Sequence, residues 1–367
     1  MSEDVKAHPM TDSEHRAGSG EHVNFAQAGF TLRHRLLNLR ISRRVVYLCL
    51  AVFALILATC LLALVWGEAT VKPGEVVQAL LGSGTRRSHM VVVQWRLPRV
   101  LLALLIGAGL ALSGAIFQSL TRNPLGSPDI IGFSTGAYTG ALLSIIIGAG
   151  SYAYTALGSF VGGIATALVV YLLSYRRGVA GFRLIIVGIG VSTALAAVNT
   201  LLIIRADLDV ALRATVWGAG TLAGANFELL GIVALICLAL IPAALATAPT
   251  LRQIELGDDA ARALGTRTQP QRLYLMFIGV ALTALATAAV GPISFVALVA
   301  PHIARRLAKA SGPALLPTAL IGALLLLISD VLAQRLAPAT PLPVGIMTVS
   351  LGGFYFIWLL VRESRKG

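Results

Sequence analysis

Ten long apolar segments, separated by short polar connections, constrain this chain more than any other feature of its sequence. They cover residues 45–66, 100–120, 130–149, 152–174, 184–204, 229–248, 273–290, 293–307, 314–332 and 344–361. A helix that crosses a bilayer needs roughly 20 apolar residues, and most of these segments are about that long. Hydrophobic types make up 57% of the 367 residues and charged types only 12%, against about 25% charged residues in soluble domains. An ordinary soluble enzyme is therefore excluded.

The fold class follows from the number and spacing of these segments. They predict an all-α, polytopic membrane protein of about ten transmembrane helices, forming one domain over residues 45–362 with no appended soluble domain. Glycine and alanine recur at small-xxx-small spacing, which predicts close packing into a compact bundle. Residues 1–44 are polar and predict a disordered, basic cytoplasmic tail, and residues 363–367 predict a short cytoplasmic C-terminal tail.

The basic residues gather on one side of the predicted membrane. With ten crossings, both ends of the chain lie on the same side. The connections on that side include the arginine-rich stretch 33–44, the segment 252–272, and Arg305, Arg306 and Lys309. Because Lys and Arg concentrate in cytoplasmic loops, both termini are predicted to be cytoplasmic in an inner or plasma membrane. This distribution accounts for the net charge of +13 without a nucleic-acid partner.

Few ionisable residues lie within the apolar segments, and this bears on the energy source. Asp330 lies near the end of the ninth segment, where a role in helix packing and a role as proton relay are equally compatible with the sequence. His302 follows Pro301, and a structural role at the resulting kink is favoured. The sequence contains no phosphate-binding loop, no nucleophile–base motif and no metal-ligand motif. It therefore predicts a chain that is not an enzyme and binds no cofactor or metal, with any ATP bound on a partner chain.

A polar segment between the sixth and seventh apolar segments is a candidate contact for such a partner. It is helix-forming, is bounded by two glycines, and carries acids at its start, where they suit the helix dipole. A short helix of this kind can lie in a groove of a partner, but an interfacial loop helix explains the same pattern equally well. The candidate coupling residues are Leu256, Gly257, Asp258, Ala260, Ala261, Ala263, Leu264 and Gly265.

The eighth apolar segment is short and broken. Gly291-Pro292 precedes it and Pro301 interrupts it. Irregular backbone at membrane depth is tolerated only where it contacts protein or lines a cavity. The segment is therefore predicted to face a central path or to pack beside it, away from lipid.

Several motifs, taken in order, resemble one family of membrane proteins, the iron–siderophore and vitamin B12 importer permeases. The resemblance covers residues 45–362, nearly all of the chain beyond the tail. Within the family, the chain looks most like the subunits for ferric enterobactin and related catecholate siderophores. The motifs are Arg96-Leu97-Pro98-Arg99, Ser113-Gly114-Ala115 with Gln118, Arg122-Asn123-Pro124-Leu125, the segment 256–265, Gly291-Pro292-Ile293-Ser294-Phe295, Ala300-Pro301-His302, Asp330 and Leu342-Pro343-Val344-Gly345.

The resemblance implies an architecture and a set of partners. The expected fold is an inverted-repeat helical bundle of the type II ABC importer kind. Two permease subunits, identical or different, would surround a path above two ATPase subunits, and an extracytoplasmic siderophore-binding protein would dock outside. The implied function is the permease step in import of a ferric siderophore, with Fe(III) carried as the siderophore complex. The alternatives are an ion-coupled secondary transporter, a membrane-embedded enzyme, and a B12 or haem importer permease of the same family.

The resemblance also implies roles for particular residues. Arg96, Arg99 and Arg335 match arginines that receive acidic groups of the binding protein, although anchoring to lipid headgroups is an alternative for them. The segment 256–265 matches the region that contacts the ATPase. The residues implied for the translocation path and its gate are Gln118, Asn123, Pro124, Gly291, Pro292, Phe295, Pro301 and His302.

Overall fold

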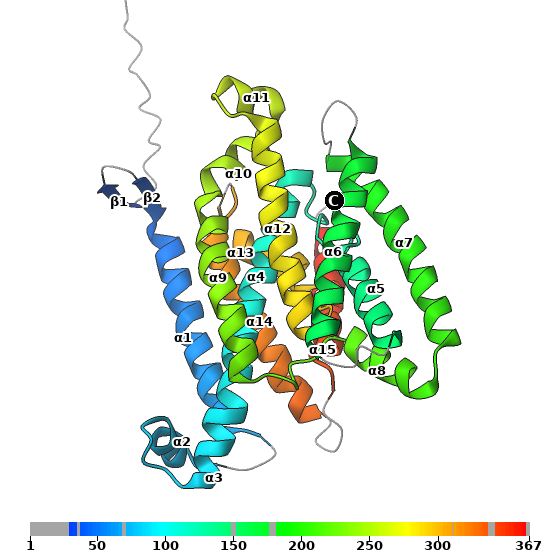
Figure 1. Cartoon of the computed structure of the whole chain (residues 1–367). Coiled ribbons are helices and arrows are strands. Elements are labelled where there is room, and N and C mark those ends of the chain that lie inside the picture. Colours follow the sequence, from blue (N-terminus) through cyan, green and yellow to red (C-terminus); the bar gives the residue numbers. More distant parts are fainter. Residues whose placement is uncertain are drawn as a thin grey trace, which may run out of the picture. The chain divides into compact units, whose positions relative to one another are not determined.

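The computed structural model describes residues 29–34, 37–67, 71–147, 152–175, 181–310, 312–336 and 342–364. The chain divides into two units, Met1–Arg43 and Arg44–Gly367. The second unit is almost entirely helical, which confirms the predicted fold class (Figure 1). Its helices are α1 (Arg43–Val65), α2 (Pro73–Leu80), α3 (Arg86–His89), η1 (Met90–Arg96), α4 (Leu97–Thr121), α5 (Phe133–Ile146), α6 (Tyr152–Ser174), α7 (Gly181–Arg205), α8 (Leu208–Gly218), α9 (Phe227–Ala246), α10 (Ala248–Glu255), α11 (Asp258–Ala263), α12 (Thr268–Val290), α13 (Val296–Ala308), α14 (Leu315–Leu336) and α15 (Val344–Ser364).

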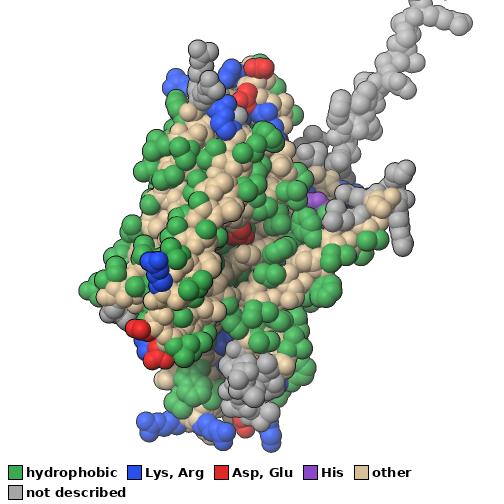
Figure 2. Space-filling model, turned by 90° about the vertical axis from the view of Figure 1, so that its right-hand side faces the viewer, with side chains coloured by type: hydrophobic (Ala, Val, Ile, Leu, Met, Phe, Trp, Pro, Cys, Tyr) green, Lys and Arg blue, Asp and Glu red, His purple; other side chains and the backbone are tan. Residues whose placement is uncertain are grey.

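Each of the ten predicted apolar segments corresponds to one helix of the bundle. Seven described helical stretches are long and apolar enough to cross a membrane, and they contain α1, α4, α6, α7, α9, α12 and α14. The other three predicted segments form α5, α13 and α15, of which α5 and α13 have only 14 and 13 residues. Hydrophobic side chains cover the middle of the face in Figure 2, and charged side chains gather mostly near its two ends, as expected of a protein that spans a bilayer.

Residues 1–28 and 35–36 of the predicted disordered tail lie outside the described residues, and disorder of the tail stays a prediction. Within the rest of the tail, β1 (Gly29–His34) and β2 (Leu37–Ser42) pair as an antiparallel hairpin. The physical reason is a local alternation in the sequence, in which apolar residues alternate with Thr, Asn and Arg. Alternation of this kind favours a strand. Residues 365–367 also lie outside the described residues.

Helix α4 forms the centre of the bundle. Nineteen of its 25 residues are buried, whereas only three of the 25 residues of α7 are buried, so α7 lies at the periphery. Helices α9, α12, α13 and α14 all pack against α4. Two glycines of α4 explain how closely these helices approach. A Cβ atom on Gly107 would overlap the carbonyl oxygen of Gly322 in α14, and one on Gly114 would overlap that of Ala297 in α13.

Polar contacts of α4 fix its neighbours as well. The Ser113 hydroxyl donates to the carbonyl oxygen of Gly279 at 2.7 Å, in α12. Near the other end of α4, Arg99 donates from Nε and a terminal nitrogen to the carboxylate of Asp330 in α14, at 2.8–3.1 Å. Asp330 also accepts from Gln334 at 2.8 Å. This carboxylate is therefore a packing residue that joins α4 to α14, one of the two roles that the sequence left open.

The two halves of the bundle repeat one arrangement in opposite directions. Helix α4 leads into an irregular segment, residues 122–132, and then the short helix α5; antiparallel to it, α12 leads into residues 291–295 and then the short helix α13. Both short helices are preceded by a residue in the left-handed region, Gly132 (φ 92°) and Phe295 (φ 70°). This correspondence agrees with the predicted inverted repeat.

The close approach at Gly114 gives a first testable prediction. Gly114→Ala should destabilise the protein by about 1–3 kcal/mol, because the added methyl group must push α13 away from α4. The matched control is Gly190→Ala in α7, where a Cβ would meet no atom within 4 Å. We expect a lower midpoint of thermal unfolding in detergent for the first variant and no decrease for the second. Equal midpoints for both variants would contradict this view of the α4–α13 contact.

Candidate functional site

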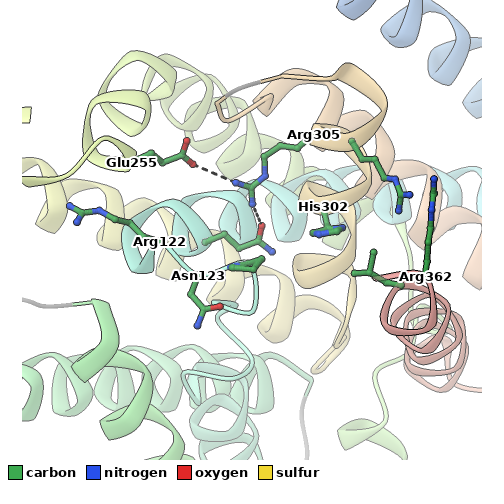
Figure 3. Close-up of a pocket in the computed structure, with 10 residues that line it drawn as sticks. Arg122, Asn123, Glu255, His302, Arg305 and Arg362 are labelled. Atoms are coloured by element: carbon green, nitrogen blue, oxygen red, sulfur yellow. Dashed lines mark hydrogen bonds and ion pairs between the residues drawn. The ribbon is translucent and has the colours of Figure 1, made fainter. Parts of the chain in front are cut away.

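A cavity of about 610 Å³ opens at the end of the bundle that carries α11, here termed the α11 end. It lies between the C-terminal end of α4, α10, α13 and α15 (Figure 3). Its volume falls in the range of small-molecule sites. The lining residues are Gln118, Arg122, Asn123, Pro124, Glu255, His302, Arg305, Arg306, Leu359 and Arg362.

The end of α4 places three of these side chains. Arg122 adopts the left-handed conformation (φ 49°) at the C-cap of α4, which ends the helix. The side-chain oxygen of Asn123 then accepts from the backbone N–H of Leu125 at 2.9 Å, a local turn that includes Pro124. The guanidinium of Arg122 turns back to donate to the carbonyl oxygen of Ile254 at 2.9 Å.

Arg305 lies at the centre of the polar network in this cavity. It donates to the side-chain oxygen of Gln118 at 2.6 Å and lies 3.6 Å from the carboxylate of Glu255. Gln118 in turn donates to the carbonyl oxygen of Leu298 at 3.0 Å, and Ser119 donates to Glu255 at 2.6 Å. Figure 3 shows Arg305 between Glu255 and His302. The network therefore ties α4 and α10 to α13.

The cavity carries an excess of positive charge. Four arginines and one glutamate line it, and a cleft lined by charges of one sign concentrates the electrostatic field. Arg306 and Arg362 come from α13 and α15 and lie over the ring of Trp358, at 5.0 and 5.5 Å from its centroid. Nδ1 of His302 lies 2.9 Å from the hydroxyl of Tyr355. The arrangement suits binding or passage of an anion.

The structure brings half of the predicted path residues together. Gln118, Asn123, Pro124 and His302 all line the cavity. The remaining four, Gly291, Pro292, Phe295 and Pro301, do not line it.

These four residues pack inside the bundle instead. A Cβ on Gly291, where φ is 78°, would overlap the carbonyl oxygen of Trp217, and the ring of Phe295 packs against Gly352. Pro301 is buried within α13. The predicted location of the broken segment away from lipid agrees with this burial.

Most of the charged lining residues were not predicted from the sequence as members of one site. Arg122 occurs in one of the sequence motifs, and Arg305 and Arg306 entered only as evidence for membrane orientation. Glu255 and Arg362 were not singled out. The signal available in the sequence was the basic pair Arg305-Arg306 at the end of the apolar segment 293–307. Such a pair indicates the side of the membrane, but it does not indicate which side chains meet in a cavity.

The candidate coupling segment, residues 256–265, follows α10 and contains one short helix, α11, which begins after a break at Gly257 (φ 112°). Ala261 is buried, and the other apolar residues of α11 and its flanks are exposed. Asp258 at the start of α11 pairs with Arg122 and, at 2.7 Å, with Arg272 in α12. The segment is therefore fixed to the bundle and presents an exposed apolar surface, composed of Leu256, Ala260, Ala263 and Leu264.

The three candidate docking arginines lie toward the opposite end, which carries α2 and is termed the α2 end (Figure 1). Arg96 donates to the carbonyl oxygens of Leu64 and Val65 at 2.6 and 3.1 Å. Arg99 is the partner of Asp330, with its side chain 19% exposed. Arg335 is exposed and lies over the ring of Trp66, 4.8 Å from its centroid. Each therefore has a partner within the chain, and Arg335 is the most accessible of the three.

The chain shows similarity to known proteins over most of its length. The model of the FecCD transport family matches residues 55–362. The ferric enterobactin transport system permease protein FepG of Escherichia coli (strain K12) is 49% identical over 330 residues, covering 89% of this chain and 99% of FepG. The probable siderophore transport system permease protein YfhA of Bacillus subtilis (strain 168) is 36% identical, covering 82% of this chain and 90% of YfhA.

A solved structure supports the same relationship. A metal-chelate type ABC transporter in an inward-facing conformation superposes with a TM-score of 0.76 at 30% identity, covering 86% of this chain and 99% of that chain. The helical architecture is therefore shared with a transporter of this type. The chain belongs to the FecCD transport family.

Proposed function

We propose that this protein is the membrane-spanning permease subunit of an ABC importer that carries a ferric siderophore, of the catecholate type, into the cytoplasm. The observation that carries the proposal is the 49% identity to a ferric enterobactin permease over nearly the whole of that relative. In this proposal, the α11 end is cytoplasmic, as are both termini. ATP is hydrolysed on separate ATPase subunits, a second permease subunit completes the path, and an extracytoplasmic binding protein delivers the ferric siderophore.

An ion-coupled secondary transporter fits the structure less well. Such a transporter needs an ionisable group that can bind and release its coupling ion within the membrane. Among the described residues, the carboxylate of Asp330 is buried and is held by Arg99 and Gln334. The carboxylate of Asp129 also has a buried oxygen, Oδ2, and its Oδ1 accepts from the Ser134 hydroxyl at 2.6 Å. The 30% identity to a metal-chelate type ABC transporter favours the ABC importer over this alternative.

Uptake measurements test this proposal directly. A strain lacking the gene should lose uptake of radiolabelled ferric catecholate siderophore and regain it with the wild-type chain. Uptake of ferric hydroxamates, haem and vitamin B12 should not depend on the chain. Restored uptake should also require the ATPase subunit. Uptake that persists without that subunit, driven by a pH gradient, would favour the secondary transporter instead.

The surface of Leu256, Ala260, Ala263 and Leu264 is the proposed contact with the ATPase. Two exposed leucines beside small residues form a shape that an apolar groove can accept. Three ion pairs connect this segment and the end of α10 to the bundle. Asp258 pairs with Arg122 at the end of α4 and with Arg272 in α12, and Glu255 pairs with Arg305 in α13. A displacement of the segment would therefore be transmitted to the walls of the cavity.

Ala260→Arg should prevent the ATPase from docking while leaving the permease folded. The new side chain would project from an exposed position, so it would clash only with the partner and bury an unpaired charge there. We expect normal membrane levels and about tenfold or greater loss of co-purifying ATPase, equivalent to about 1.4 kcal/mol or more.

Two controls make this result specific. Ala260→Ser keeps a small residue at the same site, and Ser83→Arg adds the same charge at an exposed position at the α2 end. Both should retain the ATPase. If Ala260→Arg also retains it, the segment is an interfacial loop helix and the contact lies elsewhere.

Arg335 is the best test of the proposed docking surface for the binding protein. Arg99→Glu would place two carboxylates side by side at Asp330 and destabilise the bundle, whereas Arg335 is exposed. Arg335→Glu should raise the concentration of loaded binding protein that half-stimulates ATPase activity, by about tenfold, because a rim charge affects association. Arg213→Glu, exposed on α8, is the control and should have no effect. Equal stimulation of both variants would exclude Arg335 from the docking surface.

A further inference from the structure

The cavity at the α11 end contains positive charge that no acidic group in it balances. Glu255 lies 3.6 Å from Arg305, and Arg122 pairs with Asp258, outside the lining. Among the ion pairs formed by the described residues, none includes Arg306 or Arg362. Two guanidinium groups therefore give this cavity a positive potential.

Trp358 holds these two groups on the same side of the cavity. Arg306 and Arg362 lie 5.0 and 5.5 Å from the centroid of its ring, within the range of cation–π contacts. Each guanidinium keeps planar N–H donors that can bind an oxygen anion, since stacking on a ring uses its face and not its edge. His302 and Asn123 add polar groups to the same lining.

We propose that this cavity binds the anionic iron chelate at the exit of the translocation path and selects it by charge. Arg306 and Arg362 supply the attraction. This inference rests on the proposed function and adds to it the chemical class that the permease itself recognises. Three dianionic catecholates around Fe(III) give a trianion, whereas three monoanionic hydroxamates give a neutral complex. Guanidinium groups bind catecholate oxygens through charge-assisted hydrogen bonds, and these are stronger than bonds to a neutral chelate.

The membrane potential gives a physical reason for positive charge at the exit of the path. The membrane potential is negative on the cytoplasmic side and opposes the entry of an anion. Positive charge at the exit lowers the electrostatic energy of the anion there. The site needs only moderate affinity, because the chelate must leave it for the cytoplasm.

Thiol labelling can measure both the potential and the occupancy of the cavity. The experiment uses the assembled importer in inside-out vesicles of phosphatidylcholine. Cys49, Cys60 and Cys237 are replaced by Ala, and the probe is Pro124→Cys, at an exposed lining position. An anionic and a cationic thiol reagent of equal size report the local potential. Ferric tris-catecholate and a neutral ferric tris-hydroxamate of similar size are the competing chelates.

Matched variants test whether Arg306 and Arg362, rather than other arginines, determine the labelling ratio. Arg306→Gln/Arg362→Gln should lower the ratio of anionic to cationic labelling rates by about tenfold. Arg205→Gln/Arg213→Gln, at exposed positions remote from the cavity, should leave the ratio unchanged. Arg306→Lys/Arg362→Lys should preserve the ratio. If the double glutamine variant fails to assemble, each single variant should lower the ratio by about threefold.

Protection from labelling tests the ligand. Ferric tris-catecholate should slow labelling in the wild-type background, the neutral chelate should not, and the double glutamine variant should lose the protection. Equal protection by the neutral chelate, or protection that persists in the double variant, would overturn the proposal. Protection produced by phosphatidylglycerol without any chelate would also overturn it, because the cavity would then be a site for lipid headgroups.

Parallel uptake measurements distinguish this inference from the proposed function. ATP-driven uptake of a ferric siderophore with no protection by ferric tris-catecholate would refute the exit site and leave the proposed function intact. Absence of uptake for every ferric siderophore would refute the proposed function itself.

Discussion

The close approach of α4 to its neighbours is the constraint on which the rest of the structure depends. Gly107 and Gly114 let α14 and α13 contact the backbone of α4, and Ser113 binds a carbonyl oxygen of α12. In a bilayer, association of helices gains little from the hydrophobic effect, so stability depends on such packing and on polar contacts between helices. The end of α4 also supplies Gln118, Arg122 and the turn at Asn123, so the geometry of the cavity is set by the same helix.

The inverted arrangement explains why irregular backbone is found beside the functional groups. Each half interrupts its path through the membrane with an irregular segment before a short helix, and such backbone must be satisfied by protein contacts. Gly132 and Phe295 occupy equivalent positions in the left-handed region, which glycine accepts without strain and phenylalanine adopts only at a cost of about 1–3 kcal/mol. The ring of Phe295 packs against Gly352, where an added Cβ atom would overlap it.

The sequence predicted the helices well and the site only in part. Apolar length is a local property, so each of the ten segments matched a helix; the predicted segment 130–149 was longer than α5 because residues 130–132 remain irregular. The pairing of Arg99 with Asp330, 231 positions apart, depends on how α4 and α14 pack. The convergence of Arg122, Arg305 and Arg362 from three elements likewise has no local signal. The apolar alternation of β1 and β2 is a local signal for strands, which the polar composition of residues 1–44 as a whole obscured.

The carboxylate of Asp258 has a mechanical consequence. It binds Arg122, at the end of α4, and Arg272, in the second turn of α12, so a single side chain joins the two inverted halves at one point. A force on α11 would therefore act on both halves. A tilt of one half alone would break one of the two ion pairs of Asp258. Asp258 is therefore a single point of attachment common to both halves of the bundle.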